Sequence, residues 1–312
     1  MPAQLLDISD EEYFAMPALD QSQLKQFLKN PAEWGYSRLN DDRTPTDAMK
    51  FGTAFHAYML GTAEIVNLPE GETFQKKANK DWRDEQEQAG NIVVSYADRQ
   101  LLDRMKTNIE QASLMPGNPD YMAIIANGVK EQCITWTDAK TGLDLKAKPD
   151  AIPVGTDYLI DLKTSKSAAG RDFHREVISY GYHIQALFYC QAVGKLPADM
   201  FDRTETLPTS MQFWVFEKSG VCDWRPWTVS FSKPTKNSGF NNPIIESAAL
   251  SIRQALTGIA AMQKMGEDAG LGEGLDAAAR YAMTHGYEKT PTEVEFTDWD
   301  LKDAESLLGL AR

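Results

Sequence analysis

The chain has 312 residues, of which 42% are hydrophobic and 25% are charged, so it has the composition and length of a globular protein with a sizeable core. Its formal net charge of −13 excludes a protein that coats DNA by diffuse attraction, but not an enzyme with one local basic groove. No apolar run is long enough for a membrane helix, and the acidic N-terminus lacks the pattern of a signal peptide. We therefore expect a cytoplasmic protein that does not associate with a membrane.

The N-terminal third predicts helices. Residues 20–29 have the pattern of a capped helix, and residues 47–61 that of a helix with a small-residue face that stops at Gly61. An exposed, charged helix is expected over 76–90 and an amphipathic one over 97–112.

The pattern then changes to strands. We expect strands at 129–138, 143–152 and 157–164, a long helix at 173–193, and two more strands at 209–218 and 222–231. The last stretch, 243–311, is mostly helical in its periodicity, with a break around 266–279.

This order of elements predicts an α/β fold in which a mixed β-sheet is flanked by helices. We interpret 1–312 as a single domain in three parts. A mostly helical part covers 1–120, a sheet core covers 121–242, and a helical part covers 243–312.

Three scattered cysteines, Cys133, Cys190 and Cys222, form no CxxC pair, so we expect reduced, buried thiols. This excludes a zinc finger and a four-cysteine iron–sulfur cluster.

Two carboxylates interrupt the hairpin formed by residues 148–165. If the hairpin is symmetric about its turn, Asp150 faces Asp161 and Lys148 faces Lys163, with directly opposed Cβ atoms about 4.5–5.5 Å apart. The two-residue period of a strand puts Asp161 and Lys163 on one face, opposite the apolar residues of the same strand. One face is thus expected to be core and the other a charged pocket.

A divalent cation would explain why two carboxylates stand so close together. Mg²⁺ takes oxygen ligands, needs one or two protein carboxylates and keeps several waters, which Asp150 and Asp161 fit. Lys163, two residues further on, could stabilise an attacking hydroxide or deprotonate water. The alternative is a pair of surface aspartates that happen to meet across a hairpin.

The same residues carry a resemblance to a known superfamily. Pro149-Asp150, ten intervening residues and then Asp161-Leu162-Lys163 resemble the PD-(D/E)xK nuclease signature. In the stretch "YGYHIQALFYCQA", Gln185 and Tyr189 match the QxxxY motif of the RecB-like branch, and at i and i+4 they share a helix face. His56 matches the metal-binding histidine of that branch.

The amino-acid sequence around these positions is more similar to one group within that branch. The stretches "TGLDLKAKPDAI", "LIDLKTS", "YGYHIQALFY", "ALDQSQLKQFLKNPAEW" and "NKDWRDEQEQAG" resemble the RecE-type exonucleases (exonuclease VIII) of phages and prophages. The resemblance covers roughly residues 8 to 195.

The resemblance implies a role for each matching residue. Metal would be held by His56, Asp150, Asp161 and the backbone carbonyl of Leu162. Lys163 would be the catalytic lysine, and Gln185 and Tyr189 would position the scissile or a neighbouring phosphate. Glu131, on a preceding strand, would be an accessory acid.

The resemblance also implies an activity. A RecE-type enzyme would use Mg²⁺, with Mn²⁺ as a possible substitute, to digest linear double-stranded DNA processively from 5′ to 3′ and leave a 3′ single strand for phage-type recombination. It would form a ring-like homo-oligomer and work with a single-strand annealing recombinase.

Several basic side chains gather near the hairpin. The candidates for DNA binding are Lys148, Lys166, Arg171 and Arg175, although a solvated charged face has the same composition. The aromatic residues of the expected long helix have the pattern of core residues rather than of a base-stacking platform; they are Tyr180, Tyr182, Phe188 and Tyr189.

Two alternatives stay open at this point: another RecB-like or restriction-type nuclease, and a DNA-end binding protein. A Cas4-like nuclease would need four cysteines, which the chain does not have. A restriction-type endonuclease would cut closed circular DNA, and a DNA-end binding protein without catalysis would not cut at all. The sequence leaves open the polarity of digestion, the oligomer size, the number of metal ions, the identity of the annealing partner and the role of 243–312.

Overall fold

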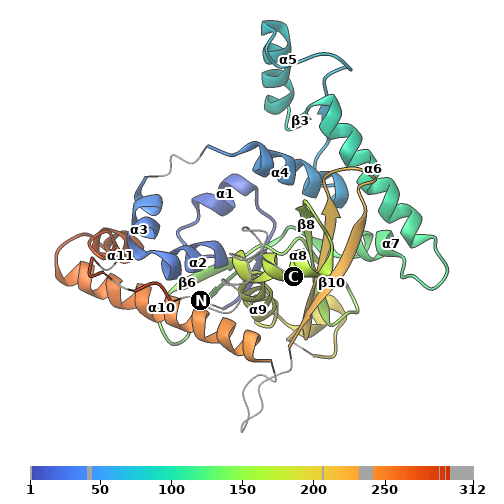
Figure 1. Cartoon of the computed structure of the whole chain (residues 1–312). Coiled ribbons are helices and arrows are strands. Elements are labelled where there is room, and N and C mark those ends of the chain that lie inside the picture. Colours follow the sequence, from blue (N-terminus) through green and yellow to red (C-terminus); the bar gives the residue numbers. More distant parts are fainter. Residues whose placement is uncertain are drawn as a thin grey trace, which may run out of the picture.

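A five-stranded mixed sheet forms the centre of the protein in the computed structural model, which describes residues 2–40, 44–205, 207–231, 242–287, 289–291 and 293–295 (Figure 1). The strand order is β10-β9-β8-β7-β4. The strands are β4 (Val129–Lys130), β7 (Ala151–Ile152), β8 (Tyr158–Ser165), β9 (Ser210–Glu217) and β10 (Trp224–Ser230). β8 and β9 are parallel, and the other neighbouring pairs are antiparallel.

Two smaller sheets accompany it. One is antiparallel, in the order β1-β5-β6, and the other is a parallel pair, β2-β3. Their strands are β1 (Gln4–Leu6), β2 (Ile65–Asn67), β3 (Ile92–Val94), β5 (Cys133–Thr137) and β6 (Asp144–Ala147).

Two predicted strands are each divided between the larger sheets. The strand expected at 129–138 breaks into β4 and β5 at Glu131, whose backbone has a positive φ of 46° that a continuous strand does not allow. The strand expected at 143–152 breaks into β6 and β7 around Pro149, which has no N–H to donate to a sheet. In both cases one half of the predicted strand, β4 or β7, joins the five-stranded sheet, and the other half, β5 or β6, joins the three-stranded sheet.

The helices surround these sheets. They are α1 (Asp10–Ala15), α2 (Gln21–Lys29), α3 (Pro31–Leu39), α4 (Asp47–Leu60), α5 (Lys77–Gln88), α6 (Tyr96–Ser113), α7 (Tyr121–Ala126), α8 (Gly170–Ser179), α9 (Tyr182–Val193), α10 (Pro243–Asp268) and α11 (Gly274–Ala282), with a 3₁₀ helix η1 (Ala198–Phe201). The predictions of α2, α4, α5 and α6 are confirmed. Asp20 caps α2 by accepting hydrogen bonds from two backbone N–H groups, and Gly61 ends α4 in the left-handed conformation.

The single helix predicted over 173–193 is wrong. The structure has two helices there, α8 and α9, separated at Tyr180 and Gly181. Gly181 has a φ of +65°, which ends one helix and lets the chain turn before the next begins. The periodicity on both sides is helical, so the break depends on one glycine that the pattern does not single out.

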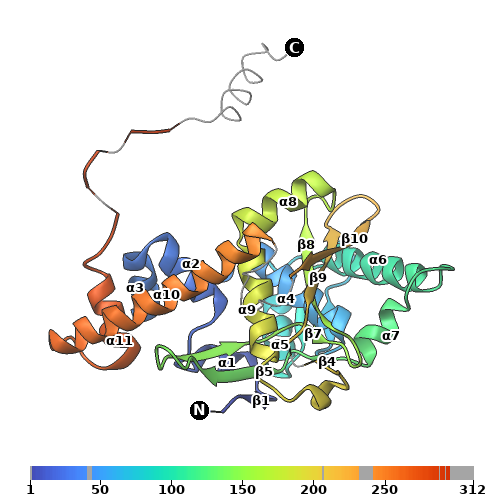
Figure 2. The same cartoon turned by 90° about the horizontal axis from the view of Figure 1, so that it is seen from below.

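Helices cover both faces of the central sheet. Leu159 and Phe213 belong to a core cluster that they share with α2, α9 and α10, while Ile160, Leu162 and Trp214 belong to another that they share with α4 and α6. Figure 2 shows α2 and α10 on the side of α9, and α6 and α7 beyond the strands. The charged face expected of β8 is therefore also a packed face, and Asp161 shares it with apolar neighbours.

The C-terminal part begins with α10 and α11, which are separated by a turn at 269–273, within the predicted break. Residues 296–311 of the predicted helical stretch lie outside the described residues. In the part of the chain that the structure describes, no helix is long and apolar enough to cross a membrane.

Candidate active site

The hairpin of β7 and β8 brings the two predicted carboxylates together. Ala151 pairs with Ile160, and Asp150 directly precedes this pair on the chain as Asp161 directly follows it, in line with the predicted register. The backbone N–H of Leu162 donates a hydrogen bond of 2.6 Å to Asp150 Oδ2. Asp150 is thereby held at the point where β8 passes through the centre of the sheet.

Asp161 is the most buried charged group of this hairpin, with a relative exposure of 1%. Gln185 Nε2 on α9 donates a hydrogen bond of 2.6 Å to Asp161 Oδ1. The ammonium of Lys163 forms an ion pair with Asp161 Oδ2. The predicted helix residue and the predicted lysine thus meet on the same carboxylate.

Lys163 is held over aromatic rings as well as against Asp161. Its Nζ lies 5.0 Å from the centre of the Tyr182 ring and 5.8 Å from that of Phe213. A cation over an aromatic face is attracted by the ring quadrupole, so these rings help to hold the ammonium at the edge of the apolar core.

His56 reaches the same place from α4. Its Nδ1 lies 3.4 Å from Asp150 Oδ1, and its side chain is 27% exposed. The contact joins a helix of the N-terminal part to a hairpin more than ninety residues later in the chain. The structure therefore brings His56, Asp150, Asp161, Lys163 and Gln185 into one connected cluster.

The two carboxylates have opposite pKa shifts. Burial raises the pKa of Asp161, and the neighbouring charge of Asp150 adds to this effect against the attraction of Lys163. For Asp150 the cost of burial is outweighed by His56, by Lys163 and by the N–H of Leu162, so its pKa is lowered. Two acids this close cannot ionise independently, and the one with more positive partners keeps its charge more easily.

His56 is shifted by the same pairing. Burial alone would lower the pKa of its imidazole, but the carboxylate of Asp150 outweighs burial and raises it. The imidazolium form and the Asp150 carboxylate therefore stabilise each other when no metal is bound.

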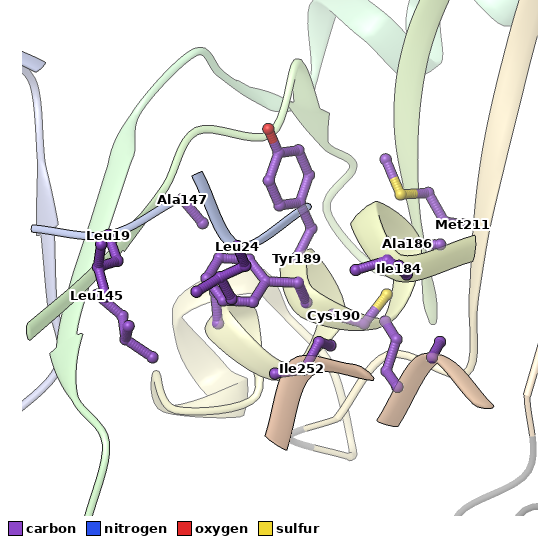
Figure 3. Close-up of a cluster of buried hydrophobic side chains, with 14 of the residues drawn as sticks. Leu19, Leu24, Leu145, Ala147, Ile184, Ala186, Tyr189, Cys190, Met211 and Ile252 are labelled. Carbon is purple, nitrogen blue, oxygen red and sulfur yellow. The ribbon is translucent and has the colours of Figure 1, made fainter. Parts of the chain in front are cut away.

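Tyr189 lies one turn after Gln185 but in a different environment. Its ring is buried among Leu24, Ala147 and other apolar side chains, and its hydroxyl points away from them (Figure 3). Burial raises the pKa of Tyr189 well above its ordinary value, and the carboxylates of Asp161 and Asp150 raise it further. The hydroxyl therefore stays neutral and can serve as a hydrogen-bond donor.

Glu131 joins the site through its backbone. Its N–H donates a hydrogen bond of 3.1 Å to the carbonyl of Asp150. Among the described residues, no hydrogen bond or ion pair connects its carboxylate with His56, Asp150 or Asp161. Its role as an accessory acid stays a prediction.

The basic candidates fall into two groups. Lys148 does not face Lys163 across the sheet, because its strand ends at Ala147, and it pairs with the exposed carboxylate of Asp10 instead. The other three are exposed side chains beyond the end of β8 or on α8: Lys166, Arg171 and Arg175. Their position after β8 is compatible with the predicted role in DNA binding.

Two residues of α2 belong to the site although the sequence analysis used them only to predict a helix. Lys25 Nζ donates a hydrogen bond of 2.9 Å to the carbonyl of Tyr180. Burial and the positive charge of Lys163 lower the pKa of Lys25 to about 8, while Asp161 acts in the opposite direction. Gln21, one turn earlier on the same helix, is also buried. The available signal was their i, i+4 spacing, which places them on one helix face.

Comparison with known proteins decides the family. A model described as a PDDEXK-like domain of unknown function, DUF3799, matches residues 20–232, which is more than half of the chain. The chain belongs to this PDDEXK-like family. The matched range contains His56, both hairpin aspartates, Lys163 and the α9 pair.

The fold is also seen in a solved structure. The chain resembles the crystal structure of a presumed exonuclease from Eubacterium rectale with a TM-score of 0.51 and 18% sequence identity, over 81% of this chain and 88% of the other. At this identity the likeness shows the fold alone. A search of curated proteins finds no match. Family and fold together show a PD-(D/E)xK nuclease fold, as the sequence predicts.

The residues of this PDDEXK-like site fit a hydrated divalent cation better than a closed metal cage. Among the described residues, no three His, Cys, Asp or Glu side chains stand in a ready metal-binding arrangement. Mg²⁺ needs only one or two protein carboxylates. Asp161 Oδ2 is buried without a hydrogen bond of good geometry and has only the ion pair with Lys163, so it has capacity for a cation. The donor set of two carboxylates, one imidazole and a backbone carbonyl fits such an ion.

Proposed function

We propose that this PDDEXK-like protein is a metal-dependent exodeoxyribonuclease that hydrolyses phosphodiester bonds of linear double-stranded DNA. The observation that carries the proposal is the cluster itself. Asp150 and Asp161 face each other across a buried hairpin, with Lys163 on one of them and His56 on the other. Burying two like charges is costly unless a positive charge lies between them. A metal ion bound by both carboxylates would supply that charge and could also bind a phosphate of the DNA.

The proposed metal ligands are His56, Asp150, Asp161 and the carbonyl of Leu162. When bound, Mg²⁺ or Mn²⁺ would lower the pKa of a coordinated water and offset negative charge on the phosphate. The protein's own groups orient the two carboxylates. The hydrogen bond from Leu162 N–H fixes Asp150, and Gln185 fixes the orientation of Asp161.

Lys163 is the proposed catalytic residue. It would polarise or deprotonate the attacking water, or stabilise the hydroxide that forms, from the edge of the buried cluster, where 19% of its side chain is exposed. Tyr189 and Gln185 would position a phosphate from α9. Phosphoryl chemistry depends mainly on positioning and positive charge, so these few groups suffice.

The finer features of the proposal rest on the RecE-type resemblance. They are 5′-to-3′ polarity, processivity, 3′ single-stranded products, a ring-like homo-oligomer, an annealing recombinase as partner and a role in phage-type recombination inside the cell. A net charge of −13 is compatible with a ring that keeps its cationic groups inside.

A single incubation series tests the core of this proposal. Purified protein is mixed with linear duplex labelled separately at each 5′ end, and with the same DNA as a covalently closed circle, in Mg²⁺, Ca²⁺ or chelator. We expect loss of label from linear DNA in Mg²⁺ alone, with the circle intact. Cutting of the circle would identify an endonuclease. No hydrolysis in any metal would identify a DNA-end binding protein.

A matched pair of variants guards against a contaminating nuclease. Asp161→Asn should lose the activity, while Asp199→Asn, which changes an exposed carboxylate of η1, should keep it. Equal activity in both preparations would show that the hydrolysis does not come from this site.

A further inference from the structure

A cleft beside the catalytic cluster is lined by α2 on one side and by the junction of α8 and α9 on the other. Its volume is about 530 Å³, within the range of small-ligand sites. Lys25 and Tyr180 lie in its wall, and the Tyr180 ring is 5.7 Å from the ring of Tyr182, over which Lys163 Nζ lies at 5.0 Å. The cleft is thus next to the residues proposed to cut the DNA.

The charge of this cleft is opposite to that of the whole chain. Lys25 and Lys29 line it together with His183, and no carboxylate is among its described lining residues. Three other clefts in the described part of the chain each contain carboxylates, including Asp144, Asp138 and Asp47. A cationic cleft on a chain with a net charge of −13 matches a phosphate better than any other common ligand.

Exposed aromatic and apolar side chains also line the cleft. Tyr180 is 59% exposed and Ile178 is 55% exposed, so the prediction that Tyr180 is a core aromatic is wrong. The break at Gly181 is the reason, since it turns Tyr180 out at the end of α8 instead of into the core.

A line of rings joins this exposed tyrosine to the catalytic lysine. The ring of Tyr180 lies 5.7 Å from that of Tyr182, and the Tyr182 ring lies under Lys163 Nζ at 5.0 Å. Tyr182 in turn stacks on Phe213 of β9 at 5.4 Å. The aromatic surface therefore starts at the catalytic residue and ends in the open cleft.

The packing of Lys25 keeps the cleft in shape. A Cβ on Gly181 would lie 2.7 Å from Lys25 Cδ, so the lysine stem passes directly over the glycine. Its ammonium is held by the carbonyl of Tyr180. The Lys25 ammonium therefore lies at the backbone carbonyl of Tyr180, the residue that carries the exposed ring.

We propose that this cleft binds one unpaired nucleotide next to the scissile phosphate, with its base against Tyr180 and Ile178 and its phosphate near Lys25 and Lys29. This proposal rests on the proposed nuclease function. Single-stranded nucleic acid is commonly bound by stacking on aromatic side chains beside a cationic groove. A base inside the duplex has both faces covered by its neighbours, whereas a base at a frayed end is free to lie against a tyrosine and to bring its phosphate to the lysines, so we expect the site to prefer a frayed DNA end.

The test measures base stacking without hydrolysis. Short duplexes carry the fluorescent base 2-aminopurine either at an unpaired terminal position or at the same position fully paired, and the full-length protein is titrated in chelator. We expect wild-type protein to quench the unpaired terminal base and to prefer the frayed end. In Tyr180→Ala the quenching should disappear and the preference should fall about tenfold.

Three further variants separate stacking from structure. Tyr180→Phe keeps a ring and should keep the quenching, and Tyr36→Ala, which removes an exposed tyrosine of α3 outside the cleft, should behave as wild type. Lys25→Met should weaken binding and reduce the salt dependence of affinity by about one phosphate contact. Undiminished quenching by Tyr180→Ala, or no preference of the wild type for a frayed end, would overturn the proposal.

The outcomes distinguish this site from the proposed function. Stacking in chelator without cleavage in Mg²⁺ would support the cleft and reject the nuclease. Cleavage of linear DNA without any effect of Tyr180→Ala on quenching would keep the nuclease and reject the cleft.

Discussion

Asp150 and Asp161 occupy opposite positions of one hairpin, but their neighbours give them different roles. Asp150 has an imidazole at 3.4 Å and a backbone N–H at 2.6 Å, which lower its pKa. Asp161 is held by the uncharged Gln185 and by Lys163, and burial raises its pKa. Asp161 is therefore the acid whose charge depends most on a cation, whether Lys163 or a metal.

The first prediction concerns Asp161→Asn. Asparagine keeps the shape of the side chain and an oxygen for Gln185, so the fold should remain, whereas alanine would leave a buried amide without its partner. Loss of a ligand charge should reduce hydrolysis by about 10³-fold, since a bound metal supplies several kcal/mol of transition-state stabilisation. DNA cleavage and calorimetric titration with Mn²⁺ check this. Activity near that of wild type at saturating Mg²⁺ would remove Asp161 from the metal site.

The second prediction concerns Lys163→Met. Methionine fills similar space over the Tyr182 and Phe213 rings but carries no charge. Turnover should fall by about 10²–10⁴-fold, the usual contribution of a positioned acid or base. Binding of Mn²⁺ near neutral pH should persist, because a repulsive cation has been removed. The pH below which Mn²⁺ binding is lost should rise. Without Lys163 the pKa of Asp161 rises further, so protons compete with the metal for this carboxylate at a higher pH.

Single-turnover cleavage and Mn²⁺ titration on one preparation separate the possibilities for Lys163. Normal digestion by Lys163→Met would end its catalytic assignment. Loss of metal binding together with thermal stability would show that the lysine holds the hairpin together instead.

At the scale of elements, the break between α8 and α9 has the largest consequence. If residues 173–193 formed one continuous helix, α8 and α9 would share a single axis. The turn at Gly181 instead directs Tyr180 into the cleft and lets α9 present Gln185 to Asp161. One left-handed residue thereby places two functional groups. Its substitution should have an effect larger than that of an ordinary turn glycine.

The third prediction compares Gly181→Ala with Gly220→Ala. Both glycines have positive φ, but a Cβ on Gly220 meets open space, while a Cβ on Gly181 would lie 2.7 Å from Lys25 Cδ. Each variant should lose about 1–2 kcal/mol of unfolding free energy from backbone strain. Gly181→Ala should lose more, and it should also displace Lys25 and weaken DNA binding. Urea unfolding and a binding assay measure both effects. Equal losses in the two variants would mean that the lysine stem moves aside freely.

A second link between elements joins α10 to the turn between β5 and β6. Arg253 donates two hydrogen bonds to the carboxylate of Asp138, at 2.9 and 3.1 Å. Burial raises the pKa of Asp138, but the hydrogen bonds from Arg253 and Thr141 outweigh burial and lower it from 3.8 to about 2. The bond pair fixes the start of the C-terminal helices against the small sheet.

The fourth prediction follows from the sign of that shift. A carboxyl whose pKa is lower in the folded state stabilises the fold above its unfolded pKa of 3.8 and loses this contribution as the pH falls toward about 2. Arg253→Met should therefore reduce the unfolding free energy by about 1 kcal/mol near neutral pH, and by less in acid. Urea unfolding at several pH values checks it, with Lys264→Met as an exposed ion-pair control. A difference that does not change with pH would rule out the Asp138 charge as its cause.

At the scale of the whole molecule, the acidic charge and the proposed DNA substrate have to be reconciled. The described residues beyond β8 and on α8 contribute exposed cations, namely Lys166, Arg171 and Arg175, and the cleft contributes Lys25 and Lys29. Lys146, in contrast, is buried and donates to backbone carbonyls of the N-terminal part, so it serves the fold and not a basic groove. Affinity for DNA should then come from few cations at one place.

The fifth prediction tests this localisation. Replacing Lys166, Arg171 and Arg175 by serine takes the formal net charge from −13 to −16, because three positive charges are lost. The slope of log affinity against log salt should decrease in magnitude by about 2–3, since each phosphate contact contributes about 0.9. The control replaces three exposed lysines elsewhere, Lys140, Lys195 and Lys264, and reaches the same net charge. A similar change in both triple variants would show that overall charge, not position, governs binding.

The sequence by itself determined the local chemistry of the site. The facing of Asp150 and Asp161 follows from hairpin register, and the shared face of Gln185 and Tyr189 follows from helix periodicity, so both could be predicted. The capped helix α2 and the end of α4 at Gly61 are likewise local, because short-range hydrogen bonds and backbone preferences govern them.

The tertiary structure alone decided which distant segments meet. The contact of His56 with Asp150 and that of Lys25 with the Tyr180 carbonyl depend on how α4 and α2 pack on opposite sides of β8, which no spacing in the sequence records. The same holds for the division of two predicted strands between two sheets and for the turn at Gly181 that exposes Tyr180. These features arise from long-range packing, where many weak contacts outweigh the local preferences from which a sequence can be interpreted.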